Sequence, residues 1–132
     1  MILEYLVFFM TSMAFYTILV MALNLAIGFT GLINLGHMVF FGIGAYASAI
    51  LTTHGVPWYI AIIIAGLFAS LIGTIIATIT VRLKGEYFAM VTLGLVFIAI
   101  AISRNWISLT RGALGIPGVP DIIKDNFYYI SI

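Results

Sequence analysis

The chain has 132 residues, of which 64% are hydrophobic and 7% are charged, and its formal net charge is +1. Because a typical soluble domain contains about 25% charged residues, this composition excludes an ordinary water-soluble fold. The chain has no cysteine, which excludes disulfides and thiolate metal sites. It also has no basic stripe, which argues against binding to nucleic acid.

Between Glu4 and Arg82 the sequence contains no Asp, Glu, Lys or Arg. Such a tract predicts several membrane spans in series. Strands of a membrane barrel would alternate apolar and polar residues over segments of about ten residues, whereas the apolar runs here are continuous. We therefore expect an all-α, polytopic membrane protein. Residues 1–132 would form one transmembrane domain of about four helices and the start of a fifth.

The first predicted span covers about residues 6–27 and is followed by a segment rich in glycine, residues 28–37. Glycine allows the backbone to leave the helical conformation, so this segment predicts a break. The second predicted span covers about residues 38–53. It is short and contains Gly42 and Gly44 near its start, which is consistent with a partial or broken span.

The third predicted span, residues 58–81, is the clearest of the four. It begins with Trp58 and Tyr59, and aromatic residues of this kind are enriched where a span meets the membrane–water interface. A polar turn at residues 82–86 separates it from the fourth predicted span, which covers about residues 87–103.

The segment after the fourth span, residues 110–120, contains too much glycine and proline for a helix. It is either a simple connector or a docking surface for a soluble partner. Residues 127–132 are apolar again and look like the opening of a fifth span. We therefore expect that the sequence is incomplete at its C-terminus.

Polar side chains gather around the break after the first span: Asn24, Thr30, Asn34 and His37. Polar groups at membrane depth usually face protein or a water-filled cavity, and transporters place broken helices where the freed backbone groups meet the substrate. One interpretation is that Asn24, Asn34 and His37 lie along a translocation pathway. The glycines that would permit its non-helical backbone are Gly28, Gly31 and Gly36. The other interpretation is a loop at the membrane surface, in which Asn34 or His37 caps the second span.

Small residues recur along one face of the third span: Gly66, Ser70, Gly73 and Ala77. Small residues allow helix backbones to approach closely in lipid, so the stripe predicts a helix–helix contact. Gly42 and Gly44 of the second span are expected to pack in the same way. The alternative is a lining that slides during gating.

The turn between the third and fourth spans carries Arg82, Lys84 and Glu86. Basic residues close to helix ends favour the cytoplasmic side of the membrane, so Arg82 and Lys84 predict a topogenic turn in the cytosol. Arg104, Arg111 and Lys124 would lie on the opposite side if the fourth span crosses the membrane, which weakens this bias. A proton relay through the turn is the functional alternative.

The sequence contains no nucleophile–base pair, no carboxylate pair and no Walker motif. His37 has no second metal ligand three or four residues away, and His54 lies in a connecting turn. We therefore expect no enzymatic activity, no ATP hydrolysis by this chain, no cofactor and no metal site. An intramembrane enzyme would need a paired acid, base or metal ligand.

Three segments of the chain, taken in order, are distinctive. They are ALNLAIGFTGLINLGH with FFGIGAY (residues 22–37 and 40–46), RLKGEYFAMVTLG (residues 82–94) and TRGALGIPGVP (residues 110–120). Together they resemble the N-terminal part of the branched-chain amino-acid ABC importer permeases, and among these the LivM-type subunit.

The resemblance implies a multi-pass permease subunit of the cell (inner or plasma) membrane. Such a subunit pairs with a sister permease and two cytosolic ATPase subunits, and an extracytoplasmic binding protein delivers the substrate. The implied substrate is a branched-chain amino acid, or a related small polar solute such as urea or an amide. The motifs do not separate these substrates.

Permeases of this family are longer and carry a cytoplasmic ATPase-coupling segment after the fifth span. The resemblance therefore implies that this sequence is the N-terminal portion of a permease, whether a fragment or the product of a split or degenerate gene. By itself it would not couple to an ATPase. The rival function is a stand-alone small membrane channel or assembly subunit without ATP coupling, and neighbouring genes would discriminate between the two.

Overall fold

The computed structural model describes residues 1–119 of the chain. Its elements, in order, are α1 (Ile2–Thr30), α2 (His37–Thr53), α3 (Trp58–Thr80), α4 (Glu86–Asn105), α5 (Ile107–Thr110) and the 3-10 helix η1 (Gly112–Leu114). The predicted opening of a fifth span, residues 127–132, lies outside the described residues.

Three of the helices, α1, α3 and α4, are long and apolar enough to cross a membrane, and α2 is a shorter apolar helix. The 17 residues of α2 extend about 25 Å, against a hydrocarbon core of about 30 Å. The 29 residues of α1 extend about 43 Å and therefore exceed the core. The prediction of an all-α, polytopic membrane protein with a short second helix is confirmed.

The break between the first two helices is narrower than the sequence predicted. Gly28 was expected to belong to it, but α1 continues through Gly28 and ends at Thr30. The chain leaves the helix only at Gly31, which has a left-handed backbone with φ of 64°. Gly42 and Gly44 do not interrupt α2, which is one continuous helix. Glycine permits a break without requiring one, and lipid favours the helix because the helix satisfies its own backbone groups.

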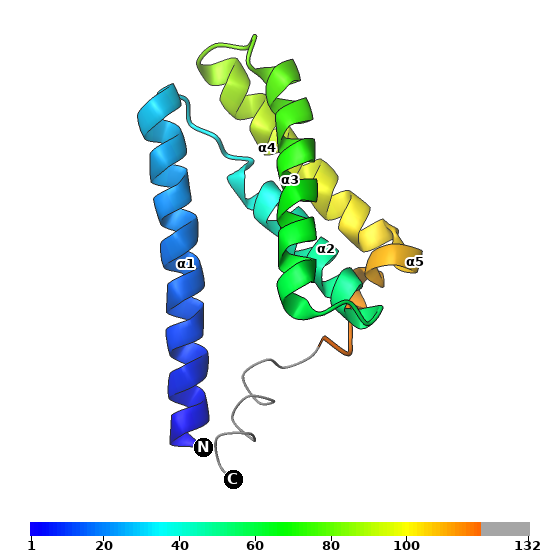
Figure 1. Ribbon diagram of the computed structural model, residues 1–132. Helices are drawn as coiled ribbons and strands as arrows, with labels where there is room; N and C mark the ends of the chain where they lie inside the picture. The colour runs from blue at the N-terminus through cyan, green and yellow to red at the C-terminus, as the bar shows by residue number, and fades with distance from the viewer. Residues whose placement is uncertain (120–132) are drawn as a thin grey trace.

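The main tertiary contact is the antiparallel pair formed by α2 and α3 (Figure 1). Ala61 and Ala65 of α3 are 0% and 2% exposed. Further along the same face, a Cβ atom placed on Gly73 would lie 3.6 Å from the ring of Phe40. Small side chains at these positions let the two backbones approach, as expected for helices in lipid.

The face of α3 that contacts α2 is not the stripe predicted from the sequence. Of the predicted small residues, Gly73 contacts α2, whereas Gly66, Ser70 and Ala77 are exposed. The contacting face instead runs through Ala61, Ala65, Ala69 and Gly73, which are four residues apart and so turn slowly around the helix. In α2, a Cβ atom placed on Gly44 would lie 3.9 Å from that of Ala69, while Gly42 has open space around it.

The long helix α1 stands to one side of the other helices (Figure 1). Leu19 is its one buried residue, and large apolar side chains such as Phe8, Tyr16 and Phe29 are 70%, 66% and 86% exposed. In a membrane these side chains meet lipid or another membrane protein, so their exposure does not oppose folding.

Residues suited to the membrane–water interface mark the two ends of α3 and α4. Trp58 and Tyr59, at the start of α3, pack edge to face with ring centroids 5.8 Å apart, and Trp106 follows the end of α4. Arg82 and Lys84 lie in the turn at the opposite ends of both helices and are exposed. Arg82 and Lys84 are therefore separated from these aromatic residues by the length of α4, and Arg104 and Arg111 lie at the same end as Trp106.

The basic pair Arg82 and Lys84, close to two helix ends, predicts the topology together with the resemblance to the permease family. We expect the turn with Arg82 and Lys84 in the cytosol and η1 outside the cell. In this cysteine-free chain, an impermeant thiol reagent added to intact cells should label the Leu114→Cys variant and leave Lys84→Cys unlabelled until the membrane is opened. Leu114 is 91% exposed, so the reagent can reach a cysteine at this position, which serves as the positive control. The reverse labelling pattern would contradict this orientation.

The α2–α3 contact predicts different results for the same substitution at two glycines. Gly73→Leu should force the Phe40 ring away and destabilise the chain by about 1–3 kcal/mol, as overpacking does. Gly66→Leu should be mild, because no atom lies within 4 Å of a Cβ atom placed there. Thermal unfolding of both purified variants in detergent is the measurement. Equal midpoints for the two variants would contradict the close packing of Phe40 against Gly73.

Candidate functional site

The polar break singled out in the sequence forms a short connector between α1 and α2, residues 31–36. The connector begins where Gly31 closes α1, with its N–H donating to the carbonyl of Ile27 at 2.8 Å. The hydroxyl of Thr30 then accepts a bond from the N–H of Leu32 at 3.3 Å. The first polar backbone groups of the connector are thus satisfied by the end of α1 itself.

Asn34 shapes the last turn of the connector. Its side-chain oxygen accepts a hydrogen bond from the N–H of Gly36 at 3.0 Å, a local side-chain-to-backbone bond typical of Asn in turns. Gly36 is buried and directly precedes α2. Neither Asn34 nor His37 caps α2 with a side-chain hydrogen bond. Asn34 therefore sets the approach of the chain to α2 rather than its first turn.

The connector is also held from α4 by Thr92. The Thr92 hydroxyl accepts a hydrogen bond from the N–H of Leu35 at 3.2 Å and donates one to the carbonyl of Ala89 at 3.0 Å. Thr92 is 3% exposed. A Cβ atom placed on Gly36 would lie only 3.1 Å from the carbonyl oxygen of Thr92, so glycine at this position permits the close approach of the two backbones.

The contact with Thr92 determines how far the connector descends along α4. Thr92 is six residues beyond Glu86, the first residue of α4, which corresponds to about 9 Å along the helix. Figure 1 shows the connector running down from the end of α1 to the start of α2, beside α4. The connector therefore lies beside the first turns of α4, and the short helix α2 begins there.

The structure brings together some of the predicted pathway residues and not others. Gly36 lies against Thr92, and its N–H donates to the side chain of Asn34. His37, half-buried, follows directly as the first residue of α2. Asn24 lies on the exposed surface of α1, before the connector. Gly28 lies in the last turns of the same helix with open space around it.

Thr92 is the residue that sequence reasoning missed. It lies within the second distinctive segment, residues 82–94, but a single threonine in an apolar span has no signal of its own. In this chain every threonine of the described residues donates its hydroxyl to a carbonyl three or four residues earlier. Only the accepted bond from Leu35 distinguishes Thr92, and that bond depends on the tertiary structure.

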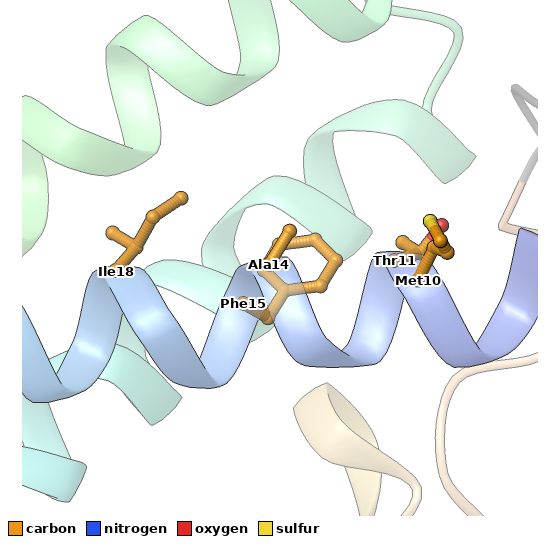
Figure 2. A pocket seen from close by; sticks show the side chains of 5 residues that line it. All are labelled: Met10, Thr11, Ala14, Phe15 and Ile18. Atoms are coloured by element: carbon orange, nitrogen blue, oxygen red, sulfur yellow. The ribbon is translucent and has the colours of Figure 1, made fainter.

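A shallow hollow of about 400 Å³ lies along α1. Figure 2 shows that its lining residues follow one another along a single helix: Met10, Thr11, Ala14, Phe15 and Ile18. The one polar group among them, the hydroxyl of Thr11, donates to the carbonyl of Val7. The hollow offers no free polar partner for an amino-acid ligand, so we do not assign the site to it. Within residues 1–119 there is also no group of His, Asp and Glu side chains that could hold a metal ion.

Comparisons with known proteins agree with the distinctive segments. The family model described as "Branched-chain amino acid transport system / permease component" matches residues 5–132. The chain is 38% identical over 106 residues to the high-affinity branched-chain amino acid transport system permease protein LivM of Escherichia coli (strain K12), covering 80% of this chain and 25% of that protein. It is 35% identical over 111 residues to the protein of the same name from Salmonella typhimurium (strain LT2), covering 83% of this chain and 26% of that protein.

The chain therefore belongs to the branched-chain amino acid transport permease family, and the resemblance noted in its sequence is confirmed. Membership and the long apolar helices together confirm a multi-pass protein of the cell membrane. The chain spans about a quarter of the length of the curated relatives that it matches. No solved structure matches it.

The close approach of the connector to α4 can be tested by cross-linking. A Cβ atom on Gly36 would lie 3.4 Å from the Cβ atom of Thr92, close to the 3.5–4.5 Å that a disulfide spans. The double variant Gly36→Cys/Thr92→Cys should therefore cross-link on mild oxidation, seen as a mobility shift that a reductant reverses. Gly28→Cys/Thr92→Cys is the matched control, since nothing lies within 4 Å of a Cβ atom on Gly28. Equal cross-linking of both pairs would contradict the described connector.

Proposed function

We propose that this chain forms the N-terminal part of the transmembrane domain of an ABC importer permease. The solute would be a branched-chain amino acid, or a related small polar solute such as urea or an amide. Membership of the permease family supports transport as the activity. The proposal of the branched-chain amino acids rests on the names of the two relatives.

The proposed partners are a sister permease, two cytosolic ATPase subunits and an extracytoplasmic binding protein. The exposed apolar surface of α1 suits a partner within the bilayer, because its large side chains are exposed while the helix itself has no polar face. Energy would come from the ATPase subunits, since the sequence has no Walker motif of its own.

The observation that carries the proposal is the position of the connector. A non-helical segment that lies beside the interior of α4 exposes backbone and side-chain polar groups at a depth where lipid offers none of the partners that water does. Such segments are tolerated where they are buried in protein or line a water-filled cavity. Asn34 and His37 are therefore the proposed pathway residues of the connector and of the start of α2, and Asn24 would extend the pathway along α1.

We propose that these residues help the solute to pass through the membrane and take part in no covalent reaction. Asn34 already uses its side-chain oxygen to shape the turn before Gly36, which leaves its amide N–H groups for water or solute. His37 lies one residue further along the chain. Polar groups with capacity to spare can replace part of the hydration shell of a passing solute. We accordingly propose transport without any covalent step.

Uptake measurements test this role of the connector. In the permease that carries this sequence, assembled with its proposed partners, Asn34→Leu should reduce uptake of radiolabelled leucine by at least about tenfold while membrane insertion stays normal. The physical reason is that Leu removes the acceptor for the N–H of Gly36 and the only side-chain amide of the connector, at a depth where an unsatisfied group costs about 1–3 kcal/mol.

The matched control is Asn105→Leu, the same substitution at the exposed far end of α4, which should transport normally. Unaltered uptake by Asn34→Leu at normal expression would favour the alternative of a surface loop. A stand-alone channel predicts uptake that needs neither ATP nor the binding protein, so omitting each of these in turn separates the two functional classes.

A further inference from the structure

We infer that Thr92 is a positioning residue for translocation: its hydroxyl fixes the connector to α4 and thereby sets where α2 begins. This inference rests on the proposed function and adds to it a residue outside the predicted pathway. It starts from a single observation. The N–H of Leu35, in the connector, donates to the hydroxyl of Thr92, in α4, across a separation of 57 residues. Within residues 1–119, the other side-chain hydrogen bonds join residues that are close together in the sequence.

The other threonines show why this bond is distinctive. Thr80 is 4% exposed and donates its hydroxyl to the carbonyl of Ile76. Thr30 and Thr110 accept backbone N–H bonds, but only from residues two positions later. Thr92 has the same burial and the same kind of donated bond as Thr80, and in addition accepts a bond from a distant segment. Its second bond therefore constrains tertiary structure rather than its own helix.

The constraint acts on the two amides that lead into α2. The N–H of Leu35 is satisfied by Thr92, and the N–H of Gly36 is satisfied by Asn34. The backbone of Gly36 also lies in close contact with that of Thr92, so little sliding is possible between the connector and α4. If the Thr92 bond is lost, the Leu35 amide must find water or another acceptor, and the connector must shift to reach it.

Thr92 does not contact the solute, so its substitution should change the maximal rate of uptake and not the KM. Its hydroxyl proton and an acceptor site are already used within the protein, and its side chain is buried. Loss of the bond should lower the maximal rate of uptake, because fewer molecules hold the connector in place, and should leave the KM for the solute unchanged.

Two measurements on the same variants test the inference. The first is amide hydrogen exchange of the purified chain in lipid nanodiscs, followed over residues 31–36. Thr92→Val keeps the shape of the side chain and removes the hydroxyl, so exchange at Leu35 should become about fivefold faster, the effect of losing one hydrogen bond. Thr92→Ser keeps the hydroxyl and should restore slow exchange. Thr80→Val, the control with equal burial and no distant partner, should leave the connector unchanged.

The second measurement is uptake kinetics in the permease assembled with its partners. We expect a severalfold lower maximal rate for Thr92→Val with unchanged KM, and rescue by Thr92→Ser. Unchanged exchange in Thr92→Val would overturn the bond as a constraint. Faster exchange with unaltered uptake would overturn the positioning role and leave Thr92 as a structural residue. Absence of uptake in the unaltered complex would instead contradict the proposed function, and the exchange result would still report on the bond.

Discussion

The backbone amides between α1 and α2 impose the constraint on which the arrangement of this chain depends. In water these groups would be solvated, but lipid offers them no partner, so each must be satisfied within the protein. Thr30, Asn34 and Thr92 supply side-chain oxygens for the amides of Leu32, Gly36 and Leu35. Thr92 lies six residues beyond the first residue of α4. The hydrogen bond from the Leu35 amide to Thr92 therefore places the start of α2 beside the second turn of α4 rather than beside its N-terminus.

The position of the connector accounts for the length of α2 and the way in which it packs. A helix that begins about 9 Å along α4 needs fewer residues to reach the far end, and α2 has 17 residues where α3 has 23. Gly44 of α2 then lies near Ala69 of α3 and Phe40 lies near Gly73, and close approach at these small residues replaces the hydrophobic effect that lipid cannot provide. The α2–α3 pair and α4 are thus joined by packing and by one distant hydrogen bond.

The sequence predicted the helices well, whereas the faces through which they pack within this chain depend on the tertiary structure. Continuous apolar runs determine where spans lie, because any exposed charge would be costly in lipid. The alanine face of α3 was not predicted, because the spacing of small residues does not say which face of a helix meets its neighbour. Gly28 was misplaced because glycine in lipid can stay helical. Thr92 had no local signal, since its partner is distant in sequence.

The helices also differ in how many side-chain hydrogen bonds would break if each were displaced. Displacing the start of α2 would break the bond to Thr92 and disturb the contact between Gly36 and α4. Rotating α1 about Gly31 would break no side-chain hydrogen bond between α1 and another long helix among residues 1–119, and would expose mainly apolar side chains that lipid accepts equally well. A transporter needs some elements that keep their relation and others that change it at low cost. Within residues 1–119, the side-chain hydrogen bonds hold the connector to α4 and leave α1 joined to the other helices without such a bond.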